Sequence, residues 1–157
     1  MARRKRALCA NIGSVSRGTT RECDLIPEFL WELKQQSPLH REHRRLVGDI
    51  ESRMEADDYY ESDDAVYDLE ALFDALGAYA PDFMYFGAHP GDGSDYGFWL
   101  DESWEEQLAE SGGIKVNDLA DIPPDHFGYV AVVSDHGNVT MYRRAGNHRL
   151  IHLWSVV

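Results

Sequence analysis

The sequence predicts an α+β fold in a single domain, with N-terminal helices packed on a C-terminal antiparallel sheet. Apolar residues recur at helical spacing as far as Gly77, and short β-rich runs separated by turn residues replace that pattern after Pro81. The chain has 157 residues, of which 43% are hydrophobic, so it is long and apolar enough for one real core.

Two helices are expected in the first third of the chain. Pro27 is typical of a first helical turn, and three apolar residues at helical spacing follow it: Phe29, Leu30 and Leu33. Ser37-Pro38 interrupts the pattern, and a second helix is expected from Leu39 to about Ala56. The start of this second helix is basic and its end is acidic, which opposes the helix macrodipole.

The third helix has the clearest pattern. Ser62 or Asp63 is a candidate N-cap, and Gly77 lies near the expected end. One apolar stripe is expected to face the core, and it consists of Val66, Leu69, Leu72, Phe73 and Leu76. At about 100° per residue the acids fall on the opposite arc, namely Asp63, Asp64, Asp68, Glu70 and Asp74. The helix is therefore expected to present a negative ridge.

The second half of the chain predicts strands. Residues 83–86 and 96–100 read as short aromatic strands joined by a glycine-rich loop, 87–95. Residues 101–110 are expected to form a short acidic helix and 114–116 a brief strand. Turn residues then separate the strands of a meander over 127–134, 139–143 and 149–157.

Charge is the most informative property of the chain. Residues 49–110 hold nineteen Asp and Glu against the single cation Arg53, a net charge of −18, while residues 1–48 carry +5 and residues 111–157 are balanced. Such a one-sided segment repels itself and suits a strongly positive partner. The overall charge of −13 argues against direct nucleic-acid or membrane binding, except through the cations of 3–6. The expected organisation is a flexible basic arm over 1–13 and one domain over 14–157.

The predicted partner-binding surface combines acids with a tyrosine. It consists of Asp57, Asp58, Glu61, Asp63, Asp64, Tyr67, Asp68, Glu70 and Asp74. Carboxylates every few positions on helices imitate part of the charge density of a duplex, and aromatic side chains supply contact energy at protein interfaces. The alternative is a solvated face that keeps the protein dispersed.

No pattern in the sequence indicates catalysis. His89, Asp92 and Asp95 in the glycine-rich loop can hold a metal or act as acid and base, but the spacing matches neither a calcium loop nor a phosphate loop. Five of the seven histidines follow residue 88, and a zinc site among them is disfavoured because two lie in separate turns, while His152 is expected to share a face with Trp154. Cys9 and Cys23 lack a nearby base. We therefore expect no enzyme activity, no cofactor and no metal.

Several stretches resemble a group of small acidic proteins from phages, plasmids and their bacterial hosts. They are residues 14–33, 85–99, 135–142 and the ending 153–157 (LWSVV). The resemblance implies one module and a mobile-element context, in which small acidic proteins often inhibit host defence, as anti-CRISPR and anti-restriction proteins do by imitating DNA. It supplies no catalytic residue.

The expected function is accordingly a non-enzymatic inhibitor. Its acidic helical surface would block a basic groove of a defence complex, CRISPR or restriction, in the bacterial cytoplasm. The absence of a long apolar run argues against a membrane span, and the two cysteines fit a reducing compartment. Two alternatives stay open: an immunity or antitoxin-like protein that neutralises a basic toxin, and a small enzyme or ligand-binding module built on the loop 87–95. The terminal strand is a candidate edge for pairing between subunits.

Overall fold

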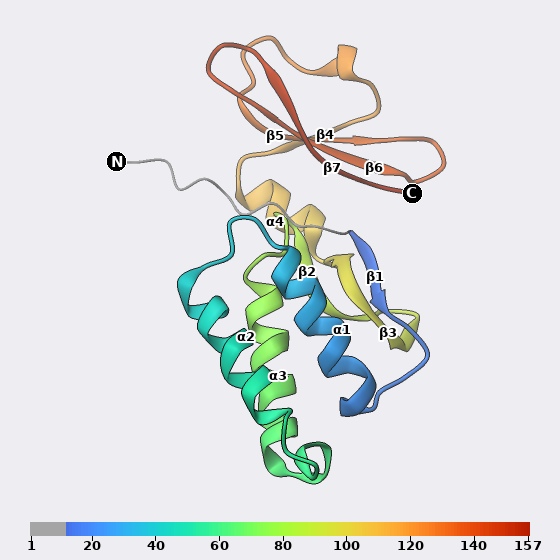
Figure 1. The fold of residues 1–157 in the computed structure, drawn as a ribbon. Coiled ribbons are helices and arrows are strands. Elements are labelled where there is room, and N and C mark those ends of the chain that lie inside the picture. The colour runs from blue at the N-terminus through green and yellow to red at the C-terminus, as the bar shows by residue number, and fades with distance from the viewer. Residues whose placement is uncertain (1–11) are drawn as a thin grey trace. The chain divides into compact units, whose positions relative to one another are not determined.

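The structure is a computed structural model that describes residues 12–157, and it confirms the α+β class. The described residues form four α-helices and two sheets, with three of the helices in the N-terminal half (Figure 1). The chain divides into two compact units, the first ending at Trp99 and the second spanning Leu100–Val157. Residues 1–11 of the predicted basic arm lie outside the described residues, and the extent of the predicted domain stays a prediction.

Three helices form one layer of the first unit: α1 (Glu22–Gln35), α2 (Arg41–Arg53) and α3 (Asp63–Gly77). A short 3-10 helix, Tyr59–Glu61, lies between α2 and α3. The predicted α3 is confirmed within one residue. Helix α1 begins earlier than predicted, because Pro27 is its sixth residue and not part of its first turn. The proline costs α1 a single backbone hydrogen bond, which the buried face of the helix outweighs.

The sheet that packs with these helices has three strands in the order β1-β3-β2. Strand β1 (Gly13–Ser16) pairs antiparallel with β3 (Asp92–Leu100), and β3 forms a hairpin with β2 (Met84–His89). The strands approach closely at Gly97, where an added Cβ would lie 1.9 Å from the carbonyl oxygen of Gly13. Only glycine fits there without moving β1.

Most of the predicted glycine-rich loop is strand, so that expectation was wrong. Strand β2 continues to His89 and β3 begins at Asp92, which leaves only Pro90-Gly91 as the turn. The sequence pattern misled because glycine usually weakens a strand, yet here Gly87 and Gly93 lie within paired strands.

The core of the first unit lies between the helical layer and this sheet. Phe29 of α1 is fully buried and makes edge-to-face contacts with Phe73, Phe86 and Tyr96, at ring-centroid distances of 5.0, 5.1 and 6.0 Å. Around these rings pack the aliphatic side chains of the three helices, including Leu25, Leu33, Ile50, Leu72 and Leu76. Aromatic pairs of this kind stabilise a fold by about 0.5–1.5 kcal/mol each beyond the burial of their area.

The second unit contains α4 (Trp104–Glu110) and a four-stranded sheet in the order β4-β5-β6-β7. Strand β4 (Ile114–Val116) is parallel to β5 (Gly128–Val133), whereas β6 (Val139–Arg144) and β7 (Leu150–Val156) continue as the predicted antiparallel meander. Trp154 opposes Met141, and both are buried. The unit thus has a small core of its own.

A register shift in β7 overturns one predicted face. Tyr142 opposes His152 and Met141 opposes Trp154, so Leu153 is an extra residue in β7. His152 and Trp154 therefore lie on opposite faces of the sheet, and His152 is exposed. Strict alternation assigned them to one face, because a bulge of one residue cannot be recognised in the hydrophobic pattern.

Among residues 12–157, none of the helices combines the length and the apolar character that crossing a bilayer requires.

Candidate functional site: the acidic end of the helical layer

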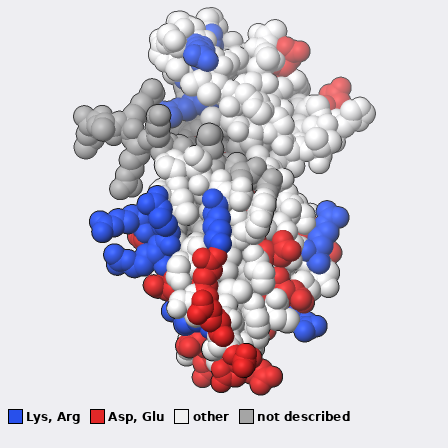
Figure 2. Space-filling model, in the orientation of Figure 1, with Lys and Arg blue, Asp and Glu red and all other residues white. Residues whose placement is uncertain are grey.

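The end of the first unit where α2 passes into α3 carries a dense group of acids. We call this group the acidic end, and it consists of five exposed residues: Asp57, Asp58, Glu61, Asp63 and Asp64. Figure 2 shows a group of red Asp and Glu atoms at this end of the first unit. Within the described part of the chain, no side-chain hydrogen bond or ion pair reaches these five carboxylates. The acidic end is therefore available to a cationic partner.

A partly buried network holds the connection between the two helices in place. Arg53 at the end of α2 donates two hydrogen bonds to Asp68 of α3, from Nε at 2.9 Å and from Nη2 at 2.6 Å. Tyr59 donates its hydroxyl to the same carboxylate at 3.0 Å. Burial, with this hydrogen bond, raises the pKa of Tyr59 far above its usual value, so the phenol stays neutral and keeps its proton for Asp68. The network fixes both ends of the loop that displays the acids.

Asp68 was wrongly assigned to the exposed surface. Only 5% of the residue is accessible, and its carboxylate is fully engaged with Arg53 and Tyr59. Conversely Val66, which was expected in the buried stripe, is 44% exposed. The buried face of α3 is thus rotated relative to the predicted stripe, and it includes Asp68, which pairs with Arg53 of α2. Helical periodicity alone cannot detect such a pair.

Four of the five remaining predicted residues of α3 align on one exposed line, and the fifth, Asp64, belongs to the acidic end alone. At 100° per residue, Asp63, Tyr67, Glu70 and Asp74 fall within about 60° of one another, and all four are exposed. Asp63 also belongs to the acidic end, so the line continues that group along the helix. The corrected surface is the acidic end plus Tyr67, Glu70 and Asp74, and it lacks Asp68.

Two exposed tyrosines accompany these acids. Tyr67 is 66% exposed, and Tyr60 is 38% exposed and packs edge-to-face on buried Tyr59, with ring centroids 4.9 Å apart. Partial burial raises the pKa of Tyr60, so its phenol stays neutral, and its partly exposed ring adds an aromatic surface next to Glu61 of the acidic end.

The opposite end of α2 is basic. Arg41, Arg44 and Arg45 are exposed in its first turns, and Arg44 Nη2 donates to the Leu39 carbonyl at 3.3 Å. Figure 2 shows a group of blue Lys and Arg atoms apart from the red end. Thirteen residues of helix separate the two groups by about 20 Å. The basic group and the acidic end therefore lie at opposite ends of α2.

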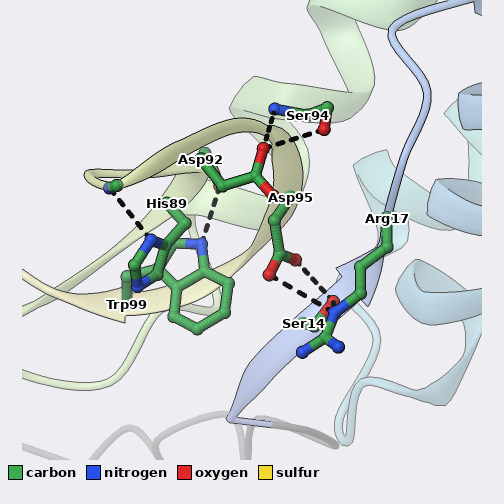
Figure 3. Close-up of polar contacts among 9 residues, drawn as sticks. Ser14, Arg17, His89, Asp92, Ser94, Asp95 and Trp99 are labelled. Carbon is green, nitrogen blue, oxygen red and sulfur yellow. Dashed lines mark hydrogen bonds and ion pairs between the residues drawn. The ribbon is translucent and has the colours of Figure 1, made fainter.

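The hairpin residues proposed as an alternative site do not converge. His89 Nδ1 accepts the Gly91 amide at 2.9 Å and its ring packs edge-on against Trp99 at 4.7 Å. Asp92 accepts the amide and hydroxyl of Ser94 at 3.0 and 2.8 Å, contacts that hold its pKa below the usual value. Figure 3 shows that Asp95 points away from both.

Asp95 has a structural partner on β1. It is 8% exposed, it accepts the hydroxyl of Ser14, and its other oxygen lies 3.4 Å from Arg17 Nε (Figure 3). Its carboxylate thereby joins β1 to β3, and it does not share a ligand position with His89 or Asp92.

The other chemical candidates are scattered over the described residues. His136 and His148 lie in the turns at opposite ends of β6, so they cannot share a metal. Cys23 is the second residue of α1, and its sulfur lies 3.2 Å from Arg21 Nη2 and 3.9 Å from Asp24 Oδ1, with no histidine among its recorded contacts in the described residues. Cys9 lies outside the described residues.

One cluster escaped the sequence analysis. His40, Glu42 and His43 gather at the start of α2 beside Tyr79, and their possible ligand atoms all lie within 4.8 Å of one another. The sequence did contain one indication of this cluster. His40 and His43 are three positions apart, a spacing that places both on one side of a helix's first turn. The surrounding arginines obscured it.

Comparison with protein-family models, with curated proteins and with solved structures gives no match to this chain. The resemblance to small acidic proteins of mobile elements therefore stays a prediction, and the function has to be argued from the surface itself.

Proposed function

We propose that the protein is a non-enzymatic binding protein whose acidic end, with the exposed line of α3, occupies a positively charged groove on another protein. The observation that supports this most is the group of five exposed carboxylates, which have no side-chain hydrogen bond or ion pair within residues 12–157. They lie on the loop before α3 and in its first turn, next to the Arg53–Asp68–Tyr59 network. A fixed display loses little conformational entropy on binding. Like charges crowded in this way favour a partner that neutralises them.

A nucleic-acid-binding groove is the kind of partner that suits the spacing of these charges. Asp63, Glu70 and Asp74 place three carboxylates along about 16 Å of helix, where one strand of duplex DNA carries about five phosphates. The charge density of α3 alone is thus lower than that of a DNA strand. The acidic end adds four carboxylates beyond Asp63, and the combined group approaches the density of a phosphate backbone.

The exposed tyrosines add aromatic contact area, which a purely electrostatic contact lacks. Exposed Tyr60 and Tyr67 flank the acids, and buried aromatic anchors account for most of the energy at protein interfaces. Charge would steer the encounter and make it fast and sensitive to salt, while the rings would lengthen the lifetime of the complex.

We further propose that the partner is a CRISPR or restriction complex of a bacterial host, and that the protein acts in the host cytoplasm. This step is supported by the resemblance to proteins of phages and plasmids, together with the charge pattern. An immunity protein against a basic toxin would use the same surface, so the choice of partner has to be decided by experiment.

The test compares two charge-reversed proteins with the same net charge. In the first, Asp57, Asp58 and Glu61 are changed to Lys; all three are exposed and lie outside α-helices. In the matched control, Glu102, Glu106 and Glu110, which are exposed in the second unit, are changed to Lys. Purified CRISPR and restriction complexes are then assayed for DNA binding and cleavage with each protein, at low and high salt.

We expect the wild-type protein and the control to inhibit at least one complex, competitively with DNA, and the first variant to lose inhibition. Equal inhibition by both variants would show that the acidic end is only a solvated face. If no defence complex is inhibited and a cationic toxin is neutralised instead, the same surface serves the immunity function.

A further inference from the structure

The start of α2 brings together two imidazoles, a carboxylate and a phenol. His40 is the N-cap residue of α2, and Glu42 and His43 lie in its first turn. Tyr79, 2% exposed, comes from the segment after α3 and lies against both histidine rings, with centroids 5.0 Å from His40 and 5.2 Å from His43. The cluster therefore connects the start of one helix with the end of another, far from the acidic end.

Hydrogen bonds orient the cluster. The Tyr79 hydroxyl accepts the His40 backbone N–H at 2.9 Å and lies 2.7 Å from His43 Nδ1. Fixing Nδ1 in this way leaves His43 Nε2 directed toward Glu42, whose Oε1 is 3.9 Å away. A histidine whose second nitrogen is held by a hydrogen bond is the usual arrangement of a metal ligand.

We propose that His40, Glu42 and His43 bind one divalent transition-metal ion of the zinc type, with Tyr79 as the residue that positions His43. Two imidazoles and one carboxylate match the ligand preference of Zn²⁺ and related ions and differ from the all-oxygen sets of Mg²⁺ and Ca²⁺. Three protein ligands leave a fourth position open for water or a small anion.

The distances require only side-chain movement. The possible ligand atoms lie within 4.8 Å of one another, whereas ligands of one tetrahedral ion, each about 2.0 Å from it, are about 3.3 Å apart. Two of the three side chains, those of His40 and Glu42, are exposed and can rotate inward while His43 stays against Tyr79.

The nearby arginines are the main opposing factor. Arg41 and Arg45 line the same open hollow as His40 and Glu42, which has a volume of about 420 Å³. Their charges weaken the binding of any cation, and they give the proposal a distinctive signature. Removing them should tighten a metal site, whereas the same change would weaken a site for phosphate or another anion.

The test uses the full chain without a polyhistidine tag, stripped with EDTA and dialysed. Zn²⁺ binding is measured by calorimetry, and Co²⁺ binding by visible absorption, which reports the ligand geometry directly. We expect one equivalent of each ion to bind. The exposed His40→Gln variant should bind at least tenfold more weakly, and the double variant Arg41→Gln/Arg45→Gln more tightly. His136→Gln, exposed in a turn of the second unit, is the matched control and should bind as the wild type does.

Three results would overturn the proposal: no stoichiometric binding, unchanged affinity in His40→Gln, or weaker binding in the double arginine variant. A calorimetric signal with inorganic phosphate in place of Zn²⁺ would assign the hollow to anions and would also reject it. Circular dichroism of each variant checks the fold, and because His40 is exposed, its replacement is not expected to unfold the protein. The outcome is independent of the proposed function, which depends on the other end of α2.

Discussion

Arg53 and Asp68 are joined by two hydrogen bonds, 2.9 and 2.6 Å long, that connect the last turn of α2 to the second turn of α3. Arg53 is the single cation of the acidic segment, and it is used inside the unit. Hydrogen bonding to Asp68 raises the pKa of Arg53, so the guanidinium is charged under all ordinary conditions. The pair explains how a segment with so many acids still folds: its one cation lies where a carboxylate has to be buried.

Replacing Asp68 should therefore destabilise the protein. Asp68→Asn leaves Arg53 and Tyr59 without their charged acceptor, and we expect a loss of about 2–3 kcal/mol, at the low end for a broken buried pair because the Arg53 side chain is 39% exposed. Urea unfolding measures this loss. Asp74→Asn, on the exposed line of the same helix, is the control and should stay within about 0.5 kcal/mol of wild type. Similar stabilities for the two variants would place Asp68 on the surface after all.

Gly97→Ala should displace β1. The new Cβ would lie 1.9 Å from the Gly13 carbonyl oxygen, a backbone atom that cannot move aside alone. We expect a loss of about 1–3 kcal/mol and faster hydrogen exchange at the amides of β1. Gly93→Ala, in the same strand, is the matched control, because the added Cβ would have no atom within 4 Å. Unchanged exchange in β1 would mean that the two strands are not in close contact.

Asp95→Asn should also weaken the contact between β1 and β3, in this case by altering a hydrogen bond. The buried carboxylate accepts the Ser14 hydroxyl, and the amide offers one acceptor oxygen in place of two and loses the charge that attracts Arg17. A loss of about 1–3 kcal/mol is expected. In a double-mutant cycle with Ser14→Ala the two changes should be strongly non-additive. Strict additivity would show that the hydrogen bond contributes nothing.

Ser103, at the start of α4, is predicted to control the pKa of Asp101. The hydroxyl of Ser103, its backbone amide and Gln107 together hold the pKa of Asp101 below 3.8. Ser103→Ala should raise this pKa toward 3.8, which carboxyl-carbon NMR titration measures. Because the folded-state pKa is lowered, the stabilisation is complete above about pH 4 and is lost as the pH falls through the folded pKa. An unchanged pKa in the variant would rule out the hydroxyl as the cause.

The fold could be predicted from the sequence where local patterns decide it. The apolar stripe of α3 and the turn residues of the meander are sufficient to place α3 and the strands β5 to β7. Strand pairing is a tertiary property, so the strand character of Gly87 and Gly93 could not be recognised, and a loop was predicted over 87–95 in its place. The extra residue Leu153 in β7 escaped for the same reason.

The candidate surface was predictable in composition but not in detail. Eight of its nine predicted residues are exposed, because charge density alone keeps most acids in water. Asp68 is the exception, since its burial depends on Arg53, fifteen positions away along the chain. The histidine cluster was missed because Tyr79, which gathers it, lies far away in sequence from His40 and His43.

The separation of cationic and anionic groups along α2 has a consequence for how the molecule meets other molecules. Arg41, Arg44 and Arg45 at its start and the carboxylates beyond its last residue act as the two poles of an electric dipole about 20 Å long. In the field of a positively charged surface such a body experiences a torque that turns its negative pole forward before any atoms touch. The protein would thus be oriented before it touches its partner. Added salt would weaken this long-range orientation at a lower concentration than it weakens the attraction between groups already in contact.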